Sequence, residues 1–385
     1  MKTFLISILI MIHVVCFSQI TTRYISPVDV DINYDPDDAA HGVVKNTASP
    51  NNKLFLFIGG SFSVPFIYQG ISNFAGNEEF DVINISYPNS VAAATLSNSS
   101  DSLVFNKYRQ EICYGTPVSP DVSVDTLNSI YTRTVKLLNY LDVTFPSENW
   151  GQFLMQSGEL DWTKIIVGGH SQGGGHAAYF GKVNNVDRVL MFSGPNDYSD
   201  FYNISANWLR ANSQTDRNRY FAYLSLLDEV VPFEKQLVNI EGIGIYPLYD
   251  TTFVDVLNDP YNNSRCLYTT QDPGSFMNHS ATVIQSDINR EVWRYMLNSQ
   301  IMTHTNDVEE PIQISVYPNP VISTLNVTSA SELKNGNYKI ISLDGRTVSK
   351  GTFLNPQSNY LDVSSLKTGC YILTIDSSST VFFKS

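Results

Sequence analysis

The sequence predicts an α/β protein, with a doubly wound and mostly parallel sheet followed by a small all-β sandwich. Between about residues 53 and 300, continuous apolar runs of strand length alternate with segments of helical periodicity. That alternation is typical of a parallel sheet covered by helices on both faces. After residue 312 the chain changes to short alternating runs separated by turn signals, which indicates an antiparallel sandwich. The predicted turns are Asn335-Gly336, Asp344-Gly345, Lys350-Gly351 and Thr368-Gly369.

Length and charge narrow the class of protein further. The chain has 385 residues, 43% of them hydrophobic, so we expect more than one domain with a sizeable core. Its formal net charge is −13. This argues against a nucleic-acid partner, because binding a phosphate backbone requires basic patches.

The N-terminus predicts a secretory signal peptide over residues 1–18. A lysine at position 2 is followed by an apolar run over 4–17 and a small residue, Ser18, which places cleavage before Gln19. The run is too short to span a bilayer comfortably, and we expect no transmembrane segment in the mature protein. Lipid attachment at Cys16 is disfavoured, because Val15 stands where a small residue is needed.

Three cysteines remain in the mature chain, namely Cys113, Cys266 and Cys370. For Cys113 and Cys266 the sequence leaves two alternatives, a disulfide between them or two buried free thiols. Residues 19–50 are polar and acidic. Aspartates between 29 and 38 suggest a calcium loop, but Tyr34 and Pro36 stand where such a loop needs glycine. We therefore expect a solvated loop and no metal or cofactor.

The order of elements places several polar residues at one edge of the sheet. We expect strands at residues 53–58, 80–85, 164–167, 186–192 and 218–227, helices at 64–75, 126–141 and 281–297, and a surface excursion from Pro88 to about 105. Sites in parallel sheets gather at the carboxyl ends of the strands. Residues 59–62, Ser171, Asp197 and Asp228 all follow such ends.

Gly169, Ser171 and Gly173 form a G-x-S-x-G pattern between a strand-like run and a run of small residues. This is the nucleophile-elbow motif, in which a sharp turn presents the serine to a histidine base. Glycine leaves room on either side of the serine. Gln172 would offer its backbone N–H to an oxyanion at the start of the helix. The alternative is a plain glycine-rich turn with an incidental serine.

The base and the acid follow from chain order. Of six histidines, His279 is the one that lies after the elbow and outside the linker, as the order serine, acid, histidine requires. Asp228 ends a strand-like run and is preferred as the acid over Asp197. A second oxyanion N–H is expected from Ser61, or from Phe62, after the first strand.

Residues 51–300 resemble a bacterial α/β-hydrolase family whose substrates are poorly defined. The resemblance rests on Arg109-Gln110-Glu111 with Tyr114-Gly115, Ser129-Ile130-Tyr131-Thr132-Arg133, the segment 162–177 and Phe192-Ser193-Gly194-Pro195-Asn196-Asp197. It implies an α/β-hydrolase catalytic domain over 19–302. The chain departs from the hydrolase pattern at one point. Hydrolases commonly have a histidine before the oxyanion loop, but no histidine precedes Gly59-Gly60 in this chain.

A polar linker is expected at 303–311, and residues 312–385 resemble the C-terminal sorting domain of the Bacteroidetes type IX (Por) secretion system. The resemblance rests on Val316-Tyr317-Pro318-Asn319-Pro320, Leu343-Asp344-Gly345-Arg346, residues 361–366, residues 368–373 and the closing Phe382-Phe383-Lys384. Cys370 stands where an apolar residue is usual, so a core thiol is expected. The resemblance implies passage through the periplasm, contact with the secretion machinery, and release or surface attachment with the tail cleaved.

Together these features predict a secreted serine hydrolase with a Ser171–His279–Asp228 triad and an acyl-enzyme intermediate. The expected substrate is a small-molecule or polymer carboxylic ester, as for an esterase or lipase. A peptidase or a polysaccharide-decorating esterase is a variant of this hypothesis. The alternative from another class is a noncatalytic surface or adhesion module on a hydrolase scaffold, since fold alone does not decide function.

Overall fold

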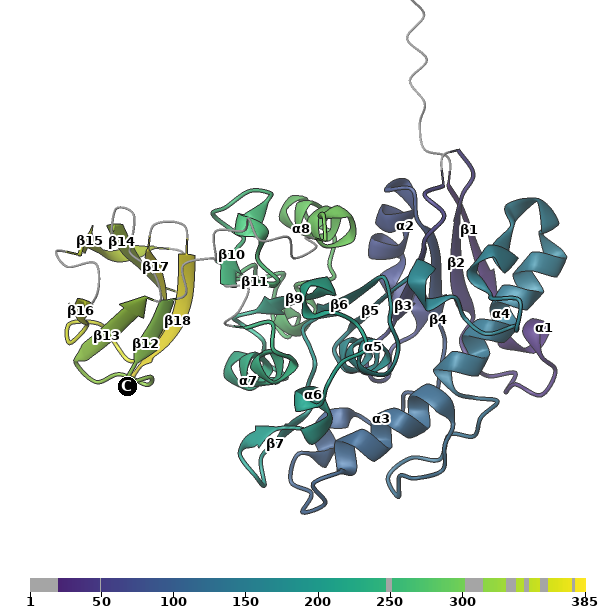
Figure 1. Ribbon diagram of the computed structural model, residues 1–385, viewed down its shortest axis with the longest axis horizontal. Helices are drawn as coiled ribbons and strands as arrows, with labels where there is room; N and C mark the ends of the chain where they lie inside the picture. Colours follow the sequence, from purple (N-terminus) through teal and green to yellow (C-terminus); the bar gives the residue numbers. More distant parts are fainter. Residues whose placement is uncertain are drawn as a thin grey trace, which may run out of the picture.

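The computed structural model describes residues 20–48, 50–246, 251–301, 314–329, 337–342, 346–353, 359–375 and 378–385 (Figure 1). The predicted signal peptide and the predicted linker at 303–311 lie outside the described residues. Within the described part of the chain, none of the helices is both long and apolar enough to cross a membrane.

A large, mostly parallel sheet forms the centre of the molecule. Nine strands of the 13-stranded sheet lie here, in the order β1-β2-β4-β3-β5-β6-β9-β11-β10. They pair in parallel except for β1 with β2 and β2 with β4, which are antiparallel. The strands are β1 (Ile20–Ile25), β2 (His41–Asn46), β3 (Leu54–Ile58), β4 (Asp81–Ile85), β5 (Ile165–His170), β6 (Arg188–Phe192), β9 (Tyr220–Ser225), β10 (Thr251–Phe253) and β11 (Cys266–Thr269).

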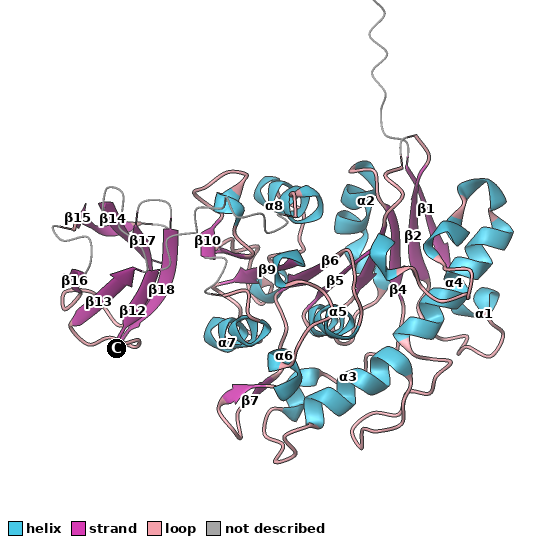
Figure 2. Cartoon of the chain, in the orientation of Figure 1, coloured by secondary structure: helices cyan, strands magenta, loops and turns pink. Residues whose placement is uncertain are grey.

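Helices cover both faces of this sheet, as Figure 2 shows in cyan around the magenta strands. They are α1 (Pro27–Val30), α2 (Gln69–Asn77), α3 (Val104–Tyr114), α4 (Ile130–Thr144), α5 (Gln172–Val183), α6 (Asn207–Arg210), α7 (Phe233–Ile243) and α8 (Asp287–Asn298). Side chains of α2 and α8 share one hydrophobic core, whereas those of α3, α4, α5 and α7 belong to the other.

Strand β3 shows why the apolar runs are continuous. Leu54, Leu56 and Ile58 belong to the first core, and Phe55 and Phe57 belong to the second. Successive side chains of a strand point to opposite faces, so a strand buried on both faces needs apolar residues at every position. The predicted strands and their parallel order are confirmed, and the carboxyl ends of β3, β5, β6 and β9 lie at one edge.

The prediction of a solvated loop over 19–50 is wrong at both ends, where β1 and β2 add an antiparallel edge to the sheet. Tertiary partners that the sequence does not show allow these polar strands to be buried. Lys45 on β2 donates to Asp81 on β4 at 2.6 Å, and Ser86 N donates to His41 Nδ1 at 3.0 Å. Among the described residues, no cluster of His, Cys, Asp and Glu could hold a metal ion.

The three predicted helices start later than expected, and α2 begins at Gln69 after a 3₁₀ turn over Pro65–Tyr68. Helix α4 begins after Ser129, whose side chain accepts from Thr132 N at 3.2 Å. Helix α8 begins after Ser286, which caps it in the same way, rather than at residue 281. Helices α3, which begins where the predicted surface excursion ends, and α7 were not predicted. These serine caps satisfy N–H groups that have no acceptor within the helix.

The tail forms two antiparallel sheets, in the orders β12-β13-β16 and β15-β14-β17-β18, around a core of its own. Its strands are β12 (Ile314–Tyr317), β13 (Thr324–Ser329), β14 (Asn337–Ser342), β15 (Thr347–Thr352), β16 (Asn359–Asp362), β17 (Gly369–Ile375) and β18 (Ser378–Lys384). One antiparallel pair, Thr251 with Ser379, joins β18 to β10 at the edge of the central sheet (Figure 1).

One predicted turn in the tail is wrong. Lys350 and Gly351 lie within β15, where Gly351 pairs with Tyr338 on β14. A Cβ at position 351 would lie 2.8 Å from the Tyr338 ring. This glycine therefore makes room for a cross-strand aromatic side chain and does not turn the chain. The predicted turns at 335–336 and 344–345 lie outside the described residues.

The three described cysteines are free thiols, so the structure has no disulfide between Cys113 and Cys266. Both of these side chains are buried, and burial raises the pKa of the Cys113 thiol far above its usual range. Cys370, expected in the core, is only half-buried. Burial still raises the pKa of its thiol to about 12.

We therefore predict that the mature protein, unfolded in denaturant without reductant, reacts with Ellman's reagent at all three thiols. The folded protein should react slowly, because reaction requires an exposed thiolate and burial opposes both exposure and ionisation. A protein with Cys266→Ser is the control and should lose one equivalent. If the denatured protein shows a single thiol that rises to three on reduction, a disulfide is present.

Candidate functional site

Ser171 stands at the carboxyl end of β5 and at the start of α5, in a strained backbone conformation with φ 56° and ψ −119°. Its N–H donates to Phe192 O on the neighbouring strand at 2.8 Å. A Cβ on Gly173 would lie 2.0 Å from Ile58 O, and one on Gly169 would lie 2.4 Å from the Gly173 carbonyl carbon. Only glycine fits at these two positions, which is the crowding expected of an elbow.

A buried arginine on α3, Arg109, contacts the first turn of α5, the helix that follows the elbow. A Cβ on Gly175 would lie 2.2 Å from Arg109 Nη2, so the third glycine of the run lets the guanidinium approach the helix backbone. Arg109 Nη1 donates to Gln172 O at 2.7 Å. Its other nitrogens pair with the Asp197 carboxylate, which also accepts from Trp208 Nε1 at 2.8 Å. Asp197 is therefore committed to this brace.

The structure brings His279 and Asp228 together. His279 lies in a short 3₁₀ turn (Asn278–Ser280), and its Nδ1 is 2.7 Å from Asp228 Oδ2. The Asp228 carboxylate also accepts from Val230 N, Val231 N and Gln236 Nε2, each at 2.9 Å. With a carboxylate on Nδ1, the neutral imidazole carries its proton there and leaves the Nε2 lone pair free.

The residue before Ser171 contacts this pair. That residue, His170, contacts His279 with ring centroids 4.9 Å apart. Within the described residues no hydrogen bond joins the serine hydroxyl to the His279 ring. Ser171 Oγ instead accepts from Asn196 Nδ2 at 3.1 Å. Because catalytic hydrogen bonds are often long in the absence of substrate, this arrangement remains compatible with a serine–histidine pair.

The predicted oxyanion residues lie next to one another. Ser61 Oγ donates to Gln172 Oε1 at 2.6 Å, which joins the loop after β3 to the start of α5. Phe62 N–H donates to Asn89 O at 3.1 Å and is therefore engaged elsewhere. In the described part of the chain, Ser61 N–H has no acceptor, so of the two predicted donors Ser61 is the one left available.

A second histidine of the elbow links the same elements. His170 is buried, with Tyr68 Oη 3.0 Å from its Nδ1 and His279 O 3.0 Å from its Nε2. Tyr68 Oη also accepts from Gly60 N at 2.9 Å. Burial, with a smaller effect of nearby His279, lowers the pKa of His170 to about 3. The ring is therefore neutral at physiological pH.

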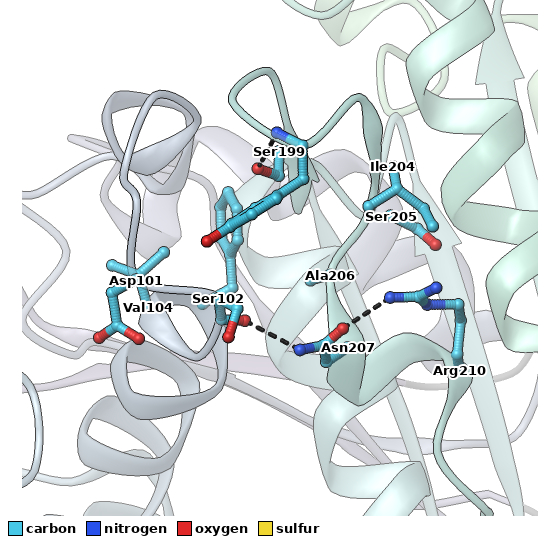
Figure 3. A pocket seen from close by; sticks show the side chains of 11 residues that line it. Asp101, Ser102, Val104, Ser199, Ile204, Ser205, Ala206, Asn207 and Arg210 are labelled. Atoms are coloured by element: carbon cyan, nitrogen blue, oxygen red, sulfur yellow. Dashed lines mark hydrogen bonds between the residues drawn. The ribbon is translucent and has the colours of Figure 1, made fainter.

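A surface hollow of about 270 Å³ lies between α3, α6 and the short hairpin of β7 (Tyr198–Ser199) and β8 (Ile204–Ser205) (Figure 3). Asn207 spans its wall, donating to Ser102 O at 3.2 Å and accepting from Arg210 Nη2 at 2.6 Å. None of the three predicted catalytic side chains lines this hollow. It is therefore separate from the site around Ser171.

Comparison with known proteins decides the nature of the tail. Residues 315–385 match the family model of the secretion system C-terminal sorting domain. The tail is a secretion sorting domain. The sorting domain marks the chain for type IX secretion to the cell surface or the extracellular space and implies contact with that secretion machinery.

The rest of the chain has more distant similarities. The comparison with curated proteins gives no match. Among solved structures, the chain is similar to esterase B from Lactobacillus rhamnosis, with 12% sequence identity and a TM-score of 0.26. That match covers 45% of this chain and 46% of the esterase chain, so the chain spans about half the length of that protein.

The sequence did not assign the residues that support the site. The sequence shows Arg109 and Asn196 only as parts of motifs and His170 only as part of the elbow, and it gives no signal for Tyr68. Arg109 could have been suspected, because a basic residue in an apolar helical pattern requires a buried partner. The others depend on contacts across many residues of sequence.

Buried histidines make stability depend on pH. Burial lowers the pKa of His41 and His170 to about 3, and that of His176 well below its usual 6.5. Between pH 6.5 and 3 the unfolded chain therefore binds protons that the folded chain does not. The free energy of unfolding falls as pH falls, by up to about 1.4 kcal/mol per pH unit for each histidine.

We expect urea unfolding at pH 7.5, 6.5, 5.5 and 4.5 to show this loss beginning near pH 6.5, above the range where most carboxylates titrate. His41→Gln should flatten the slope by about 1.4 kcal/mol per pH unit, because it removes one of the linked protons. Equal stability at pH 7.5 and 5.5 would show that these histidines are not held neutral.

Proposed function

We propose that the chain is a secreted serine hydrolase that cleaves carboxylic esters, with an α/β-hydrolase domain over 19–302. One observation carries the proposal: Ser171 lies on a glycine-constrained elbow at the same sheet edge as the hydrogen-bonded pair Asp228–His279. A serine, a histidine and a carboxylate in this chain order are what acyl transfer by an α/β-hydrolase needs.

In the first step, Ser171 Oγ attacks the ester carbonyl carbon and its proton passes to His279 Nε2. Asp228 holds the Nδ1–H tautomer and stabilises the imidazolium that forms. Asn196 donates to Ser171 Oγ, which leaves the hydroxyl proton free to face the base. No step uses a metal or a cofactor.

The developing negative charge on the carbonyl oxygen requires fixed N–H donors. Gln172 N–H, at the positive end of α5, and Ser61 N–H are the proposed pair. The tetrahedral intermediate then collapses, and His279 returns its proton to the departing alcohol. Water attacks the acyl-enzyme in the second half-reaction, with His279 again as the base, and the carboxylic acid leaves.

We predict that a fluorophosphonate probe labels the mature wild-type protein and that Ser171→Ala abolishes the labelling. The probe phosphonylates only a serine activated by a base, so it reports the nucleophile directly. Mass spectrometry of the labelled peptide locates the adduct. Labelling of the alanine variant at another serine, or none in the folded wild type, would contradict the proposal and favour a noncatalytic surface module.

Asp228→Asn should lower kcat by a factor on the order of 10⁴ with the fold intact, as in other triads where the imidazole tautomer is lost. Asp197→Asn is the matched comparison. It leaves the buried Arg109 charge without its partner and should cost about 3–5 kcal/mol of stability, while keeping most of kcat per folded molecule.

The measurement is hydrolysis of an activated ester such as p-nitrophenyl acetate, with each rate divided by the folded fraction that circular dichroism gives. This separates a loss of stability from a loss of kcat, because unfolded molecules contribute no rate. If Asp197→Asn loses kcat and Asp228→Asn keeps it, the acid belongs to the earlier strand end.

A further inference from the structure

A continuous chain of hydrogen bonds joins three parts of the proposed site. Gly60 N–H donates to Tyr68 Oη at 2.9 Å, Tyr68 Oη lies 3.0 Å from His170 Nδ1, and His170 Nε2 lies 3.0 Å from His279 O. Its ends are the loop that carries Ser61 and the turn that carries His279. Its middle is the residue before Ser171.

The direction of each bond is fixed by chemistry. The carbonyl oxygen of His279 can only accept, so His170 Nε2 must carry a proton. In a neutral imidazole Nδ1 then accepts, and the donor to it is the Tyr68 hydroxyl. Gly60 N–H can only donate, and the tyrosine oxygen accepts it. Every member of the chain is therefore satisfied in one arrangement of protons.

Close packing holds these hydrogen bonds in place. Tyr68 and His170 are both buried. A Cβ on Gly60 would lie 3.2 Å from Ser171 Cβ and 3.3 Å from both His170 Nδ1 and Tyr68 Oη. The glycine loop thus rests directly on the elbow, and a shift of either one would stretch the bonds to Tyr68 and His170.

We propose that His170 and Tyr68 are positioning residues that set the distance between the oxyanion loop, the nucleophile elbow and the backbone of the base. The inference rests on the function proposed above. It also accounts for the missing histidine before Gly59-Gly60, because in this chain the elbow itself supplies a histidine that reaches the oxyanion loop through a tyrosine.

The consequence is a specific kinetic signature. Neither side chain is placed to contact substrate, so their loss should change the alignment of reacting groups and leave ground-state binding alone. Misalignment by about 1 Å can cost on the order of 100-fold in rate. We therefore expect a fall in kcat with little change in KM, which a loss of stability alone would not produce once rates are counted per labelled site.

Three variants each break this series of hydrogen bonds at a defined link. His170→Asn keeps an acceptor near the Nδ1 position and removes the donor to His279 O. His170→Gln places an amide N–H near the Nε2 position and removes the acceptor for Tyr68. Tyr68→Phe removes the same link from the other side. Each should lower kcat per labelled site by about 10- to 100-fold, with KM within about twofold.

Two of these variants share one link, which allows an additivity test. The double variant of Tyr68→Phe and His170→Gln should be no slower than the slower single variant, because both changes break the same bond. Tyr220→Phe and His41→Asn are matched controls. They remove a buried tyrosine hydroxyl bonded to Ser213 and a buried histidine bonded to Ser86 N, and they should reduce stability without changing kcat per site.

A second measurement does not depend on activity. Nitrogen-15 NMR of histidine-labelled protein, assigned with His170→Asn, should show His170 as the Nε2–H tautomer without titration between pH 8 and 5.5. A protonated Nδ1 or a pKa within that range would overturn the inference.

The kinetic outcomes separate the two proposals. Normal labelling of the wild type with unchanged kcat in His170→Asn and Tyr68→Phe would overturn the positioning role and leave the hydrolase intact. A folded wild type that takes no label and cleaves no ester would overturn both.

Discussion

The buried ion pair between Arg109 and Asp197 is the interaction on which the packing beneath the site, and with it the stability of the fold, depends. Both side chains are fully buried, and an unpaired charge in such a place would cost several kcal/mol. The pair is satisfied by a bond to Trp208 and by the carbonyl of Gln172. It therefore ties α3, the end of β6 and the first turn of α5 into one unit, and it explains why a glycine stands at position 175.

Around that brace, the sheet edge collects groups that are far apart in the sequence. The ends of β3, β5 and β9 supply the proposed oxyanion loop, the serine and the carboxylate. The turn that carries His279 is held from two sides, through its ring by Asp228 and through its backbone by His170. This double attachment fixes both the tautomer and the location of the proposed base, as general-base catalysis requires. A rigid arrangement of this kind suits chemistry whose transition state has a fixed geometry.

The sorting domain places this site outside the cell. Its two antiparallel sheets have their own hydrophobic core, and β18 meets the central sheet at β10 through one antiparallel pair. A sheet edge such as β10 presents unpaired backbone groups, and the tail covers part of that edge. The described structure has no disulfide. The hydrophobic cores on the two faces of the sheet and the buried ion pairs therefore hold the fold together.

The sequence by itself determined the alternation of strands and helices, the elbow and the identity of the tail, because these are encoded in local periodicity, in glycine spacing and in turn residues. It also pointed to Asp228 and His279 through chain order. Only the tertiary structure decided that Asp197 pairs with Arg109, that β1 and β2 join the sheet, and that Gly351 lies in a strand. Each of these depends on a partner many residues away, such as Arg109 or Tyr338. Burial of a polar group, or of a glycine in a strand, becomes favourable only once such a partner is present.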